Sequence, residues 1–183
     1  MKKIFFVFFA FAFAFMSMSM LTSCEEDFNS SFSKKNHVYC FFNSMQYPQL
    51  HNAMGNPGQY VSIRQRVLNG TTKIEMTSSI GSEQYTADAL SVNFTYGLGG
   101  LIVGTNFYGE YLAYDLACSN CDRADRRLNI NDNGTAKCGK CGIVYDLNNY
   151  GMISAVEGDG SDSPRNLYRY RINYDGTNVI VHN

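Results

Sequence analysis

Apolar and polar side chains alternate over short stretches along most of this chain, and turn residues separate the stretches. In residues 61–67, apolar Val61, Ile63 and Val67 alternate with polar Ser62, Arg64 and Arg66, a pattern that is typical of a strand with one buried face. Asn69-Gly70 follows, a dipeptide that hairpin turns favour, and residues 72–77 continue as the returning strand. Further strands are predicted over residues 37–42, on both sides of 106–109, on both sides of 148–149 and on both sides of 175–176.

One stretch alone is interpreted as a helix, residues 82–91, with Ser82 as its N-cap. The composition agrees with a chain made mostly of strands, because it holds 13 Tyr, 13 Phe and 16 Gly and no Trp. We therefore predict an all-β fold with many turns.

The first residues resemble a secretory leader. Lys2 and Lys3 precede an almost unbroken apolar run from Ile4 to Leu21, for which a membrane-spanning helix is the alternative interpretation. Leu21-Thr22-Ser23-Cys24 looks like a bacterial lipobox, whose cysteine receives lipid and becomes the new N-terminus. We predict that residues 1–23 are a lipoprotein signal peptide and that lipid on Cys24 anchors the protein to a membrane of the cell envelope, the outer membrane.

The rest of the sequence has the length of one domain with a tether. Residues 24–36 are polar and predict the lipidated tether, and residues 37–183 predict a single β domain. The formal net charge is −1 and no basic stripe is present, so no nucleic acid is expected as a partner; the sequence identifies no protein partner. With 3 His in the chain, no catalytic residue is predicted, and the enzyme question stays open, with a non-enzyme favoured.

Four cysteines carry the candidate chemistry: Cys118, Cys121, Cys138 and Cys141 form two Cys-x-x-Cys pairs. This spacing matches a four-Cys metal site, because each pair can turn both sulfurs toward one ion. Gly139 and Gly142 let the second pair curl, so that backbone N–H groups can face the sulfurs. Disulfides or free redox thiols are the alternative in an oxidising compartment. Cys40 lies in an apolar strand and is interpreted as a buried, inert thiol.

The sequence around these pairs, about residues 99–183, resembles the Rieske domain. The matching residues are Cys118, Cys138, Gly142, Tyr145-Asp146-Leu147, Gly151, Pro164, Leu167 and Tyr170. The resemblance implies an antiparallel β-sandwich with a two-knuckle metal-site subdomain, in a Rieske-like lipoprotein.

The chain departs from the family at the cluster ligands. Asn120, with Cys121 next to it, and Cys141 stand where the two His ligands are expected, so a two-Cys, two-His centre cannot form from these loops. The site can instead hold zinc, which we favour, a single iron or an all-Cys [2Fe–2S] cluster. Three functions follow as hypotheses: a binding or structural module held by zinc, an electron-transfer protein with iron, and a thiol-disulfide oxidoreductase.

Overall fold

The computed structural model describes residues 32–158 and 164–183, so the predictions for the leader and Cys24 lie outside the described residues. Among the residues that the structure describes, no helix is long and apolar enough to span a bilayer. The elements in chain order are β1 (Val38–Asn43), η2 (Ser44–Gln46), α2 (Pro48–Gly55), β2 (Tyr60–Leu68), β3 (Thr71–Ser78), β4 (Gly81–Thr86), η3 (Ser91–Asn93), β5 (Thr95–Tyr96), β6 (Leu101–Thr105), β7 (Tyr111–Asp115), β8 (Leu128–Ile130), β9 (Thr135–Cys138), β10 (Ile143–Asp146), β11 (Met152–Val156), β12 (Arg169–Tyr174) and β13 (Asn178–His182).

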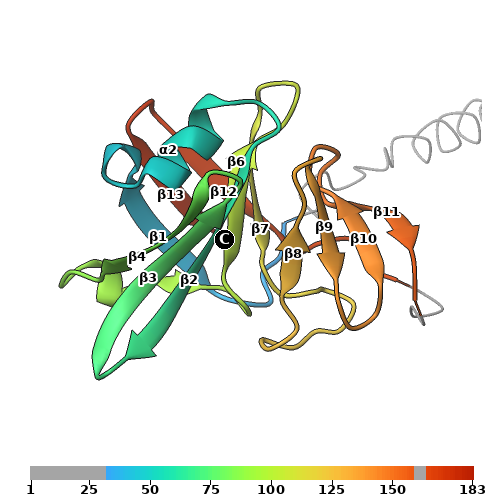
Figure 1. Ribbon diagram of the computed structural model, residues 1–183, viewed down its shortest axis with the longest axis horizontal. Coiled ribbons are helices and arrows are strands. Elements are labelled where there is room, and N and C mark those ends of the chain that lie inside the picture. Colours follow the sequence, from blue (N-terminus) through green and yellow to red (C-terminus); the bar gives the residue numbers. More distant parts are fainter. Residues whose placement is uncertain (1–31, 159–163) are drawn as a thin grey trace, which may run out of the picture. The chain divides into compact units, whose positions relative to one another are not determined.

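The strands form two antiparallel sheets (Figure 1). The large sheet has nine strands in the order β4-β3-β2-β6-β7-β12-β13-β1-β5, and the small sheet has four in the order β11-β10-β9-β8. The predicted all-β class is confirmed, and so are the hairpins across Asn69-Gly70, residues 106–109, 148–149 and 175–176. The small sheet is an insertion in the chain between β7 and β12, which are neighbours in the large sheet.

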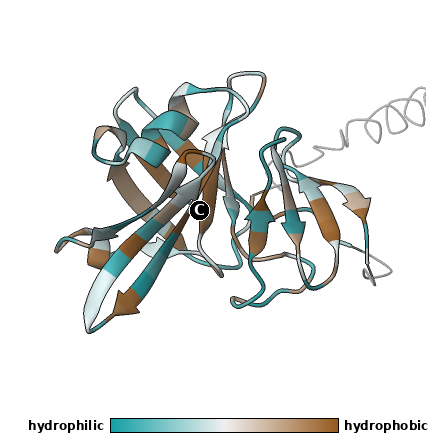
Figure 2. Ribbon diagram, viewed as in Figure 1, coloured by the Kyte–Doolittle hydropathy of each residue, from teal (hydrophilic) through white to brown (hydrophobic). Residues whose placement is uncertain are grey.

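The middle of the large sheet is buried on both faces, because a different core packs against each face. Leu101 and Val103 of β6 face the first core, whereas Ile102 between them faces the second. Adjacent residues of a strand point to opposite faces, so every residue of β6 is buried. Figure 2 shows apolar positions in both sheets.

The second core joins the two sheets and contains three of the four cysteines. It consists of Tyr60, Ile102, Leu112, Tyr114, Leu116, Cys118, Leu128, Ala136, Cys138, Cys141, Ile143, Tyr145, Leu147 and Leu167. The metal-site candidates are therefore part of the packing between the sheets.

The helix predicted over residues 82–91 does not form, and the α-helix of the described chain lies elsewhere. Residues 81–86 form β4, an edge strand that pairs with β3 and exposes most of its side chains. The helix forms at α2 instead, where Pro48 occupies the first turn and fixes a φ angle that suits a helix start. Leu50, Ala53 and Met54 then share one face at spacings of three and four, and this face is buried in the first core.

In the Gly-rich stretch 97–104, Gly104 lets the backbone of β6 approach the start of β2 closely. A Cβ on Gly104 would overlap the carbonyl oxygen of Gln59 and the ring of Tyr60 on the neighbouring β2. Gly55, at the end of α2, has open space where its Cβ would lie.

We expect Gly104→Ala to destabilise the protein by about 2 kcal/mol or more, because backbone must shift to admit the methyl group. Gly55→Ala is the matched control and should be neutral or stabilising by up to about 1 kcal/mol, since alanine is the better helix former. Urea denaturation of the two variants measures both values. Equal stability of the two variants would contradict the close approach at Gly104.

Candidate metal centre

The two Cys-x-x-Cys segments fold into the same local structure. In the first knuckle, residues 118–122, the N–H of Asp122 donates to the carbonyl of Cys118 at 2.9 Å. In the second knuckle, residues 138–142, the N–H of Gly142 donates to the carbonyl of Cys138 at 3.0 Å. Asp122 and Gly142 both have left-handed φ angles, 52° and 70°, so each chain turns sharply just after its second cysteine.

Gly142 is required for space as well as for its backbone angle. A Cβ there would lie 2.5 Å from the backbone nitrogen of Gly158. Asp122 takes the same conformation with a side chain that has partners of its own. It forms a salt bridge with Lys35 and accepts a hydrogen bond from the Tyr168 hydroxyl at 3.0 Å.

The knuckles bring the four sulfurs together. All four Sγ atoms lie within 4.8 Å of one another. Two pairs that join different knuckles are closer still: Cys118 and Cys141 at 3.6 Å, and Cys121 and Cys138 at 3.7 Å. A tetrahedral ion with bonds of about 2.3 Å to sulfur has edges of about 3.8 Å, so the arrangement fits a single ion. The predicted convergence of Cys118, Cys121, Cys138 and Cys141 is present in the structure.

The sulfurs are free thiols in a largely buried setting. All five cysteines that the structure describes are free, and of the four at the site only Cys121 is partly exposed. Burial raises the pKa of the Cys118 and Cys121 thiols. At Cys138 burial acts in the same direction, but N–H groups of Cys141 and Lys140 hold its pKa below the ordinary value. Thiolates at such a site need a compensating cation, which a metal ion supplies.

Two hydroxyl groups next to the sulfurs were not singled out as functional from the sequence. The Tyr145 hydroxyl lies 3.4 Å from Cys118 Sγ and 3.3 Å from Ser119 Oγ. Ser119 also donates to the carbonyl oxygen of Arg165 at 3.1 Å, which ties the first knuckle to the segment after Pro164. Both hydroxyl-bearing residues are buried. A hydroxyl that donates to a bound thiolate orients the ligand and stabilises its charge.

A buried carboxylate fixes the chain just before the first knuckle. Asp115, at the end of β7, accepts hydrogen bonds from the backbone N–H groups of Leu98 at 2.6 Å, Gly99 at 2.9 Å and Ala117 at 2.7 Å. It also accepts one from the Tyr170 hydroxyl at 2.6 Å. Burial raises the pKa of this carboxyl, and the four hydrogen bonds act in the opposite direction. Asp115 therefore connects three segments at the entry to the site. No pattern in the sequence identified it, because its partners come from distant positions.

Cys40 lies apart from the site, in β1. It is fully buried and its thiol donates to the carbonyl oxygen of Thr95 at 3.1 Å. Burial raises the pKa of this thiol. These observations agree with its interpretation as an inert core residue.

Comparison with known proteins gives no relative: no family model, no curated protein and no solved structure matches this chain.

We expect Tyr145→Phe to lower the affinity of the site for metal by roughly tenfold, because the Cys118 thiolate loses its hydroxyl partner. Tyr114→Phe is the matched control: Tyr114 is equally buried in the second core, but its hydroxyl donates to the Leu147 carbonyl at 2.8 Å. Competition with a chromophoric chelator measures the two affinities. Equal affinities in both variants would show that the hydroxyl next to Cys118 serves packing alone.

Proposed function

We propose that this chain is a cell-envelope lipoprotein whose β domain binds one zinc ion at Cys118, Cys121, Cys138 and Cys141. The ion holds together a binding or structural module. The observation that carries the proposal is the tetrahedral spacing of four sulfurs that come from two knuckles sixteen residues apart in sequence.

The spacing supports one ion over a two-iron cluster. A [2Fe–2S] cluster binds its cysteines in two pairs on separate irons, so the two pairs stand farther apart than the edges of one tetrahedron. Here all four Sγ atoms lie within 4.8 Å of one another, whichever way they are paired. Zinc is favoured among single ions because closed tetrahedral sites with four Cys ligands most often hold it.

The position of the site supports a stabilising role. Leu128, Ala136 and Ile143 supply much of the apolar surface of the small sheet, and each large side chain contributes only about 1.5–3 kcal/mol when fully buried. Metal binding in small four-ligand sites contributes on the order of 10 kcal/mol near neutral pH. The ion would therefore be the largest single contribution to the order of the segment between β7 and β12.

A Rieske-like origin of the domain is part of the same proposal. The order of elements supports it, because β7 leads into the first knuckle and the turn between β9 and β10 forms the second. The segment after Pro164 also contacts the first knuckle, through the hydrogen bond from Ser119 to Arg165. The lipid anchor at Cys24 and the outer-membrane location rest on the sequence pattern.

Protein purified under reducing, anaerobic conditions should carry one zinc per chain and be colourless. Cys138→Ser should lose the metal and lower the melting temperature, because removing one thiolate leaves three ligands and an incomplete tetrahedron. Cys40→Ser is the matched control, since it removes a buried thiol outside the site and should keep the metal. Elemental analysis and thermal melts with and without chelator measure these effects.

Other results of the same measurement would replace the proposal. Bound iron with a visible charge-transfer band would make electron transfer the function of the site. Metal-free protein that melts identically with and without chelator would point to redox thiols or disulfides.

Cells that express the full chain should attach a fatty-acid probe to it, and Cys24→Ala should abolish the label. The reason is the Leu21-Thr22-Ser23-Cys24 sequence after an apolar run. Equal labelling of both forms would disprove lipidation at Cys24. Cys40→Ala serves as the control and should label like the parent chain.

A further inference from the structure

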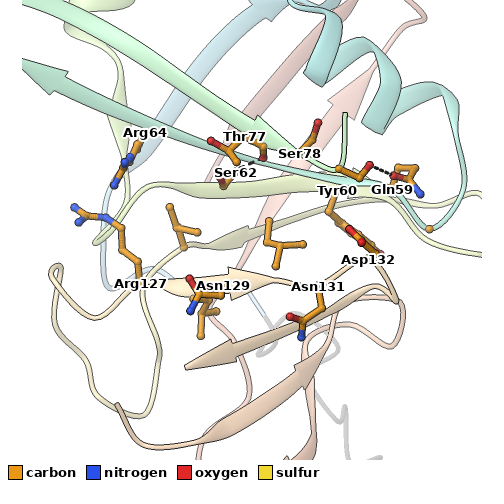
Figure 3. Close-up of a pocket in the computed structure, with 15 residues that line it drawn as sticks. Gln59, Tyr60, Ser62, Arg64, Thr77, Ser78, Arg127, Asn129, Asn131 and Asp132 are labelled. Atoms are coloured by element: carbon orange, nitrogen blue, oxygen red, sulfur yellow. Dashed lines mark hydrogen bonds between the residues drawn. The ribbon is translucent and has the colours of Figure 1, made fainter. Parts of the chain in front are cut away.

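A cleft of about 310 Å³ lies between the large sheet and the small sheet, on the side of β8 away from β9 (Figure 3). Its floor is apolar and is formed by Leu116, Leu128 and Ile130. Its walls are polar and carry hydroxyl, amide and charged side chains from β2, β3, β8 and the residues next to these strands. The volume is in the range of sites that bind small ligands.

One end of the cleft is cationic. Figure 3 shows the guanidinium groups of Arg64 and Arg127 facing each other there. Arg64 donates hydrogen bonds to the Glu75 carboxylate from Nε at 3.0 Å and from one terminal nitrogen at 2.8 Å. Its other terminal nitrogen has no partner among the described residues. Arg127 donates Nε to the Gly99 carbonyl at 2.8 Å and forms no salt bridge with any described residue. Three terminal nitrogens are thus open to an anion.

The other end of the cleft is anionic. Asp132 lies there, beside Gln59 and away from the two arginines (Figure 3). Within the described part of the chain, its carboxylate takes part in no hydrogen bond or salt bridge. From Arg127 to Asp132 an extended chain covers about 16 Å. The charges at the two ends are therefore separated by roughly the length of four or five extended residues.

Between the two ends, β8 presents an open strand edge to the cleft. The N–H of Leu128 points away from β9 and donates to the Leu116 carbonyl at 2.9 Å, whereas Asn131 donates toward β9, to Thr135, at 2.8 Å. Antiparallel pairing alternates, so Ile130 directs its N–H and C=O to the same side as Leu128. Leu116 and Ala117, which lie beside Leu128 and Arg127 on that side, do not reach Ile130, and no described backbone group pairs with Ile130 there.

We propose that this cleft binds a short peptide with free ends, which adds as an antiparallel strand to the edge of β8. The antiparallel direction places the C-terminal carboxylate of the peptide at Arg64 and Arg127, and its N-terminal ammonium at Asp132. Backbone groups of the peptide pair with Ile130, and the Asn129 amide, which lines the cleft, binds beside them. This inference rests on the proposed role as a binding module and names its ligand.

The lining favours a peptide over a saccharide. Tyr60 is the one aromatic residue among the described lining residues, and it is 3% exposed, so the cleft offers no aromatic face for a sugar ring. An open strand edge with opposite charges at its two ends matches the backbone and both termini of a peptide in one orientation.

The test uses the full chain and the unblocked pentapeptide Ala-Val-Thr-Val-Ala, whose β-branched residues favour the extended state. Calorimetric titration should show binding, and C-terminal amidation or N-terminal acetylation should each weaken it roughly tenfold, since each removes a charge-assisted contact. In Arg127→Ala, amidation should have a clearly smaller effect, because Arg64 alone remains at that end, and in Asp132→Asn acetylation should have no further effect. Peptide binding should also slow hydrogen exchange at the Ile130 amide.

Neighbouring residues supply matched controls. Arg126→Ala removes an arginine that is adjacent in sequence to Arg127 but lies outside the cleft. Arg66→Ala removes the second arginine that pairs with Glu75, and Arg66 does not line the cleft either. Both should keep the effect of amidation. Arg127→Lys retains the positive charge and should bind more tightly than Arg127→Ala, which separates recognition from a loss of folding.

Several results would overturn the inference. These are no binding of the pentapeptide at millimolar concentration, equal binding of blocked and unblocked peptides, and an unchanged amidation effect in Arg127→Ala. Binding of galacturonate that depends on Arg127 but leaves Ile130 exchange unchanged would also overturn it, in favour of a small-acid site. Metal content measured on the same samples keeps the two proposals apart: peptide binding without metal contradicts only the zinc proposal, and zinc without peptide binding contradicts only this one.

Discussion

Four thiol groups that are mostly withdrawn from water and gathered within 4.8 Å of one another are the constraint on which this fold depends. Sulfur atoms at tetrahedral spacing interact only weakly as neutral thiols, and as thiolates they repel one another. Under the proposed function, a cation at their centre would convert that repulsion into attraction. Both knuckles meet at these sulfurs, and three of the four cysteines belong to the core that joins the small sheet to β6 and β7.

The second core shows why the site and the packing cannot be separated. Cys118, Cys138 and Cys141 belong to this core together with Tyr114 and Tyr145. The two tyrosine rings fill the space between the sheets and direct their hydroxyl groups to different partners, one to a backbone carbonyl and the other toward a sulfur. Changes to these cysteines are therefore changes to the core as well.

Local patterns predicted the hairpins and the two cysteine knuckles, because each of these structures depends on residues that are neighbours in sequence. Asn69-Gly70 sets its own turn, and a Cys-x-x-Cys segment sets its own knuckle. The failures arose where distant residues decide. β4 exposes nearly all its side chains and has no alternation to detect, so its pairing with β3 overrides local preference. The cleft that Arg64 and Arg127 line lies between strands that no local pattern relates to each other. The helix α2, by contrast, did have a local signal, in Pro48 and the spacing of the apolar residues after it.

The position of β13 determines when the large sheet can be assembled. β13 lies between β12 and β1, and it pairs with both along its whole length. β1, and β5 that pairs with it, therefore have no place in the sheet until residues 178–182 have left the ribosome. The closure of the large sheet therefore comes after the synthesis of the small sheet and of β12, which leaves β1 without a partner on that side until β13 is available.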